Sequence, residues 1–325
     1  MTPSAAASRG TSMRRLRVHV AGRFAREALA SGAGEVCLAF RRSFYLRFPG
    51  GRYACVGEPS LGHGPLNALV PALAVPAIGE RLLVDTIDAQ RWTPPALVAC
   101  GGPDLEAVER AARGRRPAEG LACLIVGERN AIAIHAEPAL QALERWFSGE
   151  ALHSGAQTLI GLGPGLTPSG DDYFAGVLLA LRACARTRMA DDLWRWLEAR
   201  IAARTSSISA AHLAAAAQGE AHEALHCALG CLFGSGADWD QALRALDAVG
   251  HCSGWDGLAG AVAVARVAAS GRLLPQPPMN RSPSRASDRS ESARPMSVMP
   301  NGRPSSRNPA GTAIAAMSRR FTKFV

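Results

Sequence analysis

The sequence contains one lysine, Lys323, among its 325 residues. Schiff-base chemistry requires a lysine amine, and the phosphate loop of nucleotide-hydrolysing enzymes requires a lysine after its glycines. Because Lys323 lies in the C-terminal tail, the body of the chain can perform neither chemistry. We also find no strand followed by the GxGxxG turn and later acidic residue of dinucleotide-binding folds, so we expect no nucleotide cofactor.

The sequence also lacks a CxxC pair and long hydrophobic runs, and we expect no leader segment. Its eight cysteines are scattered without a CxxC pair, which is typical of reduced residues in a cytoplasmic protein. No signal-peptide core follows the N-terminus, and the longest apolar stretch, LNALVPALAVPAI, is broken by prolines and too short to span a bilayer. We therefore expect a soluble cytoplasmic protein with no membrane partner.

The formal charge of +9 is concentrated in the tail. Residues 1–271 carry 26 basic and 25 acidic side chains, whereas residues 272–325 carry 10 basic and 2 acidic ones. The tail is rich in Ser, Pro and Arg with few aliphatic residues, so we expect residues 272–325 to be disordered, and residues 1–14 as well. A basic arm can bind nucleic acid in a salt-sensitive manner, but this composition favours an extension without a nucleic-acid partner.

Residues 15–136 show the short apolar runs and turn signals of β-structure. We expect an antiparallel sheet or a partial barrel with strands at VHVAG (18–22), EVCLAF (35–40), FYLRF (44–48), RYACVG (52–57), RLLVDT (81–86), LACLIVG (121–127) and AIAIHA (131–136).

Residues 137–271 have the texture of helices. Pro138 suits the first turn of a helix that Gly149 ends, and residues 171–187 are apolar on nearly all faces, which indicates a buried helix. Asp191 and a hydroxyl of TSSIS (205–209) are candidate caps for the next two helices, and three more helices follow before residue 271. The fold class is therefore predicted as α+β, with a β-rich half at 15–136 and a helical half at 137–271 that holds two buried central helices.

A short motif occurs twice. SGDDYFAG (169–176) and SGWDGLAG (253–260) agree at five of eight positions, and each opens an apolar helix. Free amides at a helix start favour an anion, and glycines let the backbone approach it. We therefore predict that the two helix starts face one site for a small phosphate or carboxylate ligand.

The aspartates at these helix starts have two interpretations. Asp171, Asp172 and Asp256 can be ordinary first-turn residues, which the helix dipole favours. Alternatively, Mg²⁺ lies between them and the anion, because Mg²⁺ binds through one or two carboxylates plus substrate oxygens.

One competing motif is HEALH (222–226), which has the spacing of a zinc-protease helix. The pattern lacks a third ligand at the expected spacing, because Leu229 and Leu232 occupy those positions. We interpret HEALH as residues on a helix face. His63, His153 and His251 lie in predicted loops, and His251 adjoins the second copy of the motif, where it could act as an acid or base.

Residues 15–270 resemble the AllH-type subunit family of bacterial oxamate carbamoyltransferase. Three segments carry this resemblance: LIGLGPGLTPSGDDYFAG (159–176), TSSISAAHLAAAAQGE (205–220) and GHCSGWDGLAG (250–260). The resemblance implies a subunit of a complex that transfers a carbamoyl group between carbamoyl phosphate and oxamate, with oxalurate and phosphate on the other side, in allantoin catabolism. It also implies partner subunits that resemble acyl-CoA synthetases.

Within that reaction we assign roles to the motif residues. Asp172 and Asp256 are the candidate catalytic bases, and Asp171 and Asp172 are the candidate Mg²⁺ ligands. The candidate substrate-binding residues are Gly163, Gly165, Thr167, Ser169 and Gly170 in the first loop, Ser253 and Gly254 in the facing wall, and Thr205. The alternative is a noncatalytic assembly or regulatory subunit of an acyl-CoA-synthetase-like complex, in which the glycine loops pack helices or bind a partner.

Overall fold

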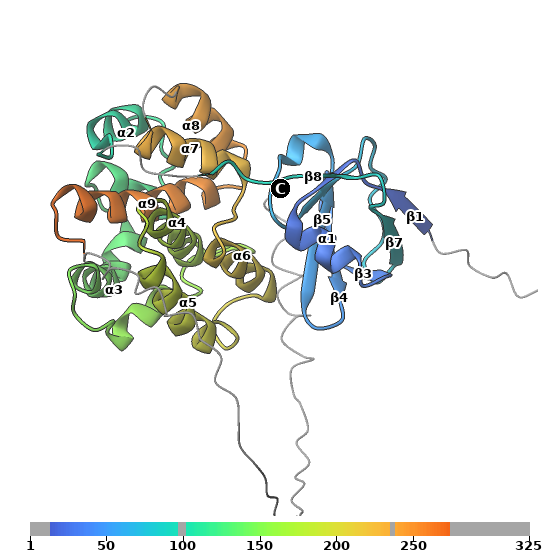
Figure 1. Cartoon of the computed structure of the whole chain (residues 1–325), viewed down its shortest axis with the longest axis horizontal. Helices are drawn as coiled ribbons and strands as arrows, with labels where there is room; N and C mark the ends of the chain where they lie inside the picture. Colours follow the sequence, from blue (N-terminus) through green and yellow to red (C-terminus); the bar gives the residue numbers. More distant parts are fainter. Residues whose placement is uncertain (1–13, 97–101, 235–237, 274–325) are drawn as a thin grey trace, which may run out of the picture. The chain divides into compact units, whose positions relative to one another are not determined.

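The computed structural model describes residues 14–96, 102–234 and 238–273. Every described residue belongs to one compact unit. Strands precede residue 92 and helices predominate after residue 104, which confirms the predicted α+β class (Figure 1). Disorder was predicted for residues 1–14 and 272–325, and of these residues 1–13 and 274–325 lie outside the described residues.

The strands form one curled mixed sheet. Among the described residues it has the order β1-β7-β3-β4-β5-β6-β2-β8. Pairs β1/β7, β5/β6 and β2/β8 are parallel and the others are antiparallel, so the prediction of an antiparallel sheet was only partly right. The strands are β1 (Arg14–Arg17), β2 (Val20–Ala21), β3 (Gly34–Ala39), β4 (Ser43–Phe48), β5 (Arg52–Gly57), β6 (Asn67–Leu69), β7 (Arg81–Asp85) and β8 (Gln90–Arg91).

Alternation along β4 directs its side chains to two different cores. Phe44, Leu46 and Phe48 are buried in the core that also contains α1 (Arg23–Leu29). Tyr45 points to the opposite face, where it is buried with Cys55 and with Ile208 from the helical half. One face of the sheet therefore contacts α1, and the other contacts residues of the helical half.

Eight α-helices and two short 3-10 helices follow among the described residues. They are α2 (Leu105–Ala112), η2 (Ala122–Val126), α3 (Ala131–Phe147), η3 (Ser154–Leu159), α4 (Ser169–Ala183), α5 (Thr187–Ile201), α6 (Ser207–Ala217), α7 (Glu223–Phe233), α8 (Trp239–Asp247) and α9 (Ser253–Ala269). A further 3-10 helix, η1 (Pro59–Leu61), lies between β5 and β6. None of these helices is long and apolar enough to cross a membrane.

Two of the predicted strands are wrong. LACLIVG forms η2, and AIAIHA forms the first part of α3, so Pro138 lies inside that helix and not in its first turn. A short apolar run does not distinguish a strand from a buried helical segment. The Asn130 side chain accepts a hydrogen bond from the Ala133 amide at 3.0 Å and caps α3, which stabilises the helical alternative.

The predicted cap at Asp191 is also wrong. Helix α5 begins at Thr187, and the Asp191 carboxylate instead accepts a hydrogen bond from Arg182 at 2.8 Å. The hydroxyl cap predicted in TSSIS is confirmed, because Ser206 Oγ accepts a hydrogen bond from the Ser209 amide at 3.0 Å at the start of α6.

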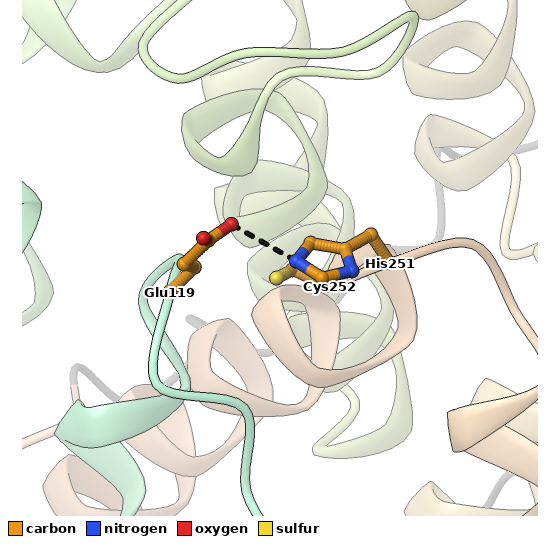
Figure 2. A group of neighbouring side chains, drawn as sticks. All are labelled: Glu119, His251 and Cys252. Carbon is orange, nitrogen blue, oxygen red and sulfur yellow. Dashed lines mark hydrogen bonds and ion pairs between the residues drawn. The ribbon is translucent and has the colours of Figure 1, made fainter. Parts of the chain in front are cut away.

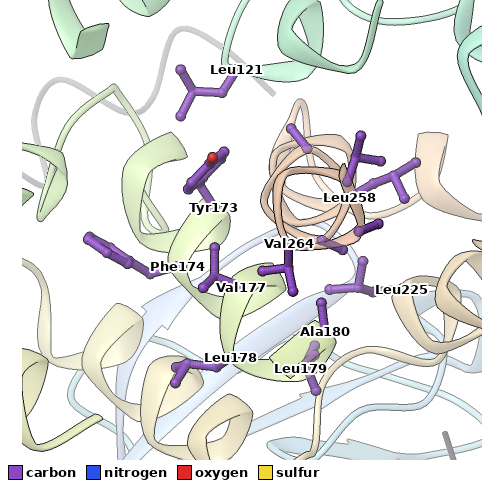
Figure 3. Close-up of a cluster of buried hydrophobic side chains, with 14 of the residues drawn as sticks. Leu121, Tyr173, Phe174, Val177, Leu178, Leu179, Ala180, Leu225, Leu258 and Val264 are labelled. Atoms are coloured by element: carbon purple, nitrogen blue, oxygen red, sulfur yellow. The ribbon is translucent and has the colours of Figure 1, made fainter. Parts of the chain in front are cut away.

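Helices α4 and α9 form the centre of the helical half (Figure 3). Phe174, Val177 and Leu178 of α4 and Leu258 and Val264 of α9 are fully buried. Figure 1 shows the two helices crossing, with the other helices around them. The two buried central helices predicted from the sequence are therefore confirmed, and their starts carry the two copies of the motif.

Candidate functional site

The two copies of the motif contact each other reciprocally. A Cβ added at Gly176 would lie 1.7 Å from the Gly257 carbonyl oxygen, and one added at Gly260 would lie 2.0 Å from the Tyr173 carbonyl oxygen. Gly176 and Gly260 are the last positions of the two copies, and Tyr173 and Gly257 are the fifth. The last position of each copy thus packs against the fifth position of the other, as in a local twofold arrangement.

The serines and aspartates of the motif are also paired between the two copies. The hydroxyls of Ser253 and Thr167 oppose the rise in the pKa of Asp172, and the Ser169 hydroxyl opposes that of Asp256, so each serine lies near the aspartate of the other copy. Thr167 Oγ1 and Ser253 Oγ are themselves 2.9 Å apart. The two helix starts therefore lie side by side, and the prediction that they form one ligand site stays a prediction.

Both aspartates of this pair have an oxygen without a partner. Among the described residues, Asp172 Oδ2 and Asp256 Oδ2 are shielded from solvent and accept no hydrogen bond. Asp256 is 1% exposed, whereas Asp172 as a whole residue is half-buried. Such atoms are rare in folded proteins and call for an explanation by chemistry or by a ligand.

Burial and mutual repulsion control the protonation of the pair. Burial raises the pKa of Asp256 to about 7, although the Leu121 amide, which donates to Oδ1 at 2.6 Å, opposes the shift. The pKa of Asp172 is raised well above its ordinary value, first by burial and then by the negative charge of Asp256. Carboxyls that hold a proton near neutral pH are suited to acid and base catalysis.

Asp171 differs from its neighbour, because donors of the chain itself surround its carboxylate. Oδ1 accepts from the Gly161 amide at 2.8 Å, and Oδ2 accepts from Ser209 Oγ at 2.6 Å and from the Thr205 hydroxyl. Burial raises the pKa of Asp171, and these hydrogen bonds act against the rise. The carboxylate therefore ties the glycine loop to the start of α6, and the roles predicted for Asp171 in Mg²⁺ binding and for Thr205 in substrate binding remain untested predictions.

The glycines before α4 allow a compact loop. Gly163 and Gly165 have φ of 108° and 112°, a region that L side chains rarely adopt. Gly170 packs against the chain, because a Cβ there would lie 1.9 Å from the Leu159 carbonyl oxygen, and its amide donates to the Leu162 carbonyl at 2.9 Å. The Gly170 amide is therefore already paired, which narrows the predicted anion cradle to the other loop residues.

Gly254, predicted for the facing wall, also has a packing role. A Cβ at this position would lie 2.8 Å from Leu246 Cδ2 of α8. Its role in ligand binding stays a prediction, as do those of Gly163 and Gly165.

The HEALH segment does not have the geometry of a zinc site. His222 precedes α7, with Nδ1 accepting from the Ala224 amide at 3.2 Å and Nε2 hydrogen-bonded to the Leu61 carbonyl at 2.9 Å. His226 Nε2 accepts from the Ala221 amide at 3.1 Å. Both nitrogens of His222 are hydrogen-bonded to backbone groups, so neither is free to bind zinc. The interpretation of HEALH as structural residues agrees with the structure.

The loop histidines have separate partners. His63 Nδ1 lies 2.5 Å from Glu223 Oε2, and His153 Nδ1 accepts from the Gly155 amide at 3.0 Å. A cavity of about 730 Å³ lies beside His222 and Glu223, and its other lining residues include Gly62, Cys227 and Cys231.

Sequence reasoning missed the segment that completes the Asp256 environment. Gly120 and Leu121, which precede η2, contact the Asp256 carboxylate, and Glu119 lies 2.9 Å from His251 Nε2 (Figure 2). No local pattern links residues 119–121 to residues 251–256, because the contacts are made by the folded chain. Cys252 completes this group, and burial together with the nearby carboxylates of Asp256 and Glu119 raises the pKa of its thiol to about 12.

Part of the chain is similar to a known protein family. Residues 159–265 match the family model described as oxamate carbamoyltransferase subunit AllH. The matched segment begins in the glycine loop and ends within α9, so it contains both copies of the motif. No curated protein and no solved structure matches the chain. Residues 159–265 of the chain are therefore similar to the AllH family of oxamate carbamoyltransferase subunits.

Proposed function

We propose that this chain is a subunit of an oxamate carbamoyltransferase-like complex and that it binds a small anionic substrate between the two copies of the motif. The observation that carries the proposal is the crossed arrangement of serines and aspartates, in which Asp172 and Asp256 each keep one buried, unpartnered oxygen. The family description names a subunit of this enzyme, which supports the presence of other subunits.

The proposed reaction joins the oxamate nitrogen to the carbamoyl carbon of carbamoyl phosphate. The C–N bond forms, the bond from the carbamoyl carbon to the phosphate oxygen breaks, and the nitrogen loses a proton. Asp256 suits the role of base, because its pKa of about 7 leaves a substantial ionised fraction at neutral pH. Asp172, whose pKa burial and the charge of Asp256 raise well above its ordinary value, suits the role of a protonated donor to the carbamoyl oxygen.

The hydroxyls and the loop amides are proposed to hold the anion. Thr167 and Ser253 bring their oxygens to within 2.9 Å of each other from two different helix starts. The loop with Gly163 and Gly165 lies immediately before α4, where the helix dipole favours negative charge. Mg²⁺ at Asp172 remains the alternative means of neutralising the two carboxylates.

The test uses the reconstituted complex with single aspartate variants. Asp172→Asn and Asp256→Asn should each lower turnover at least about tenfold, because general acid and base groups contribute roughly that much or more. Asp191→Asn is the control, since its carboxylate is exposed and pairs with Arg182. Wild-type turnover in both test variants would reject the assigned chemistry.

The second candidate is a noncatalytic assembly or regulatory subunit. It is favoured by Gly170, Gly176 and Gly260, whose lack of side chains is already explained by close backbone packing. Titration of the purified chain with carbamoyl phosphate, oxamate and Mg²⁺, separately and together, distinguishes the candidates. Binding of an anion that Thr167→Val weakens supports the substrate site, whereas absence of binding supports assembly alone.

A further inference from the structure

Three side chains of different chemistry converge beside the start of α9. Glu119 lies in the turn before η2, and His251 and Cys252 lie in the turn before α9. One ligand atom from each, a carboxylate oxygen, an imidazole nitrogen and the thiol sulfur, lies within 4.8 Å of the other two. Figure 2 shows the three side chains directed toward a common point from two segments that are distant in the sequence.

An exposed ion pair alone does not account for this group. The Glu119 and His251 side chains are 70% and 78% exposed, and exposed pairs of this kind contribute about 0–1 kcal/mol. Nor does helix capping explain Cys252, which occupies the N-cap of α9 but makes no side-chain cap hydrogen bond. Ser, Thr, Asp and Asn are the residues that normally serve at that position.

The donor set indicates the class of ion. A carboxylate, an imidazole and a thiolate together suit Zn²⁺ and similar transition metals, whereas Mg²⁺ takes oxygen ligands. Three protein ligands leave the fourth tetrahedral position for water or for an oxygen of a small anion, as in catalytic zinc sites.

The surroundings of the group carry negative charge. Asp256 follows Cys252 by one helical turn, with its amide donating to the Cys252 carbonyl at 2.9 Å. Gly120, the neighbour of Glu119, lies against the same Asp256 carboxylate. A cation held by Glu119, His251 and Cys252 would therefore lie near the carboxylate of Asp256.

We propose that Glu119, His251 and Cys252 form a binding site for a divalent transition metal of the zinc class, adjacent to the Asp172 and Asp256 pair. The proposal goes beyond the carbamoyl-transfer function and does not depend on it, because metal binding can be measured on the chain alone.

The experiment is a Co²⁺ titration of the metal-free full-length chain, followed by optical absorption. Co²⁺ replaces Zn²⁺ at such sites, and a cobalt–thiolate bond gives a charge-transfer band in the near ultraviolet. We expect a band that saturates at one Co²⁺ per chain, is displaced by Zn²⁺ and does not respond to Mg²⁺. Cys252→Ser should abolish it, and His251→Gln and Glu119→Gln should each weaken binding by at least about tenfold.

Cys227→Ser is the matched control, because Cys227 is an exposed thiol on α7 beside His222 and Glu223. This variant should keep the band. Absence of a band in the wild-type chain, or a band lost in Cys227→Ser and kept in Cys252→Ser, would overturn the proposal. Far-ultraviolet circular dichroism of each variant checks that it folds, and Cys252→Ala provides a second variant if Cys252→Ser does not.

Discussion

Gly120 lies directly against the carboxylate of Asp256, although 135 residues separate Leu121, its neighbour, from that aspartate. A Cβ at Gly120 would be 2.5 Å from Asp256 Oδ1, the atom that accepts the Leu121 amide. The turn before η2 thus fixes one oxygen of the carboxylate and leaves the other, Oδ2, without a partner. The position of Asp256 therefore depends on a glycine outside the motif and outside the matched family segment.

Gly120→Ala should disturb this carboxylate. The added methyl group must displace Asp256 or the turn, which weakens the hydrogen bond from Leu121. Gly114→Ala is the matched control, because Gly114 has a similar positive φ (77° against 71°) but no neighbour within 4 Å of its would-be Cβ. Both variants incur backbone strain of about 1–2 kcal/mol, so the steric contact is measured by the difference between them.

The measurement is chemical unfolding of both variants, together with turnover of the complex that contains each. We expect Gly120→Ala to lose roughly 1–3 kcal/mol more stability than Gly114→Ala and to lower turnover further. Equal losses in the two variants would show that the contact with Asp256 has no energetic consequence.

Gly176→Ala tests the crossing of the two central helices. The new methyl group would overlap the Gly257 carbonyl, so α4 and α9 must separate, at a cost of about 3 kcal/mol or more of unfolding free energy. Gly230→Ala in α7 is the control, because no atom lies within 4 Å of its would-be Cβ and alanine favours helix by up to about 1 kcal/mol. A mild effect at Gly176 in urea unfolding would contradict the close packing described for the motif.

The adjacent aspartates should respond oppositely to the same substitution. Asp171→Asn replaces an oxygen that accepts from Thr205 and Ser209, which should cost roughly 1–3 kcal/mol of unfolding free energy. Asp172→Asn replaces a buried carboxyl whose pKa is raised and leaves no donor of Oδ2 unsatisfied, so stability should stay level or rise. Thermal unfolding of the two variants gives the comparison, and a larger loss for Asp172→Asn would reverse the assigned roles.

Local signals were sufficient to predict most of the helical half. The repeated motif located the starts of α4 and α9, and Ser206 supplied the hydroxyl cap predicted for TSSIS. Apolar content on all faces predicted that α4 is buried, because only the interior accommodates such a helix. The motif also predicted that Asp172 and Asp256 belong to one arrangement.

Contacts made by the folded chain could not be predicted in this way. LACLIVG is apolar because it packs into the helical core, where Arg266 donates to the Leu124 and Ile125 carbonyls at 2.8 and 2.6 Å. That environment favours a 3-10 turn over a strand. A short apolar segment of sequence does not distinguish the two structures. The different roles of Asp171 and Asp172 likewise depend on which neighbours the loop brings to each carboxylate.

The titration of Asp256 gives a prediction for stability against pH. An unfolded aspartate has a pKa of about 3.9, and the folded value is about 7. Between these values the folded protein retains a proton that the unfolded chain has released. The contribution of this carboxyl to the free energy of unfolding is therefore largest below about pH 4. It decreases as the pH rises and is lost above about pH 7.

Comparison of the wild type with Asp256→Asn isolates this contribution. The amide does not titrate, so the wild type should lose stability relative to the variant by up to about 1.4 kcal/mol per pH unit across the window. Asp172 adds to the loss in the same direction, because burial and the charge of Asp256 raise its pKa, and Asp256→Asn removes that charge. Urea unfolding at about pH 4, 5.5 and 7 measures the difference, with a variant in which both carboxyls are amides as the reference. Parallel curves for the wild type and Asp256→Asn would mean that folding does not raise the pKa of this carboxyl, and the proposed sharing of acid and base roles would fail with it.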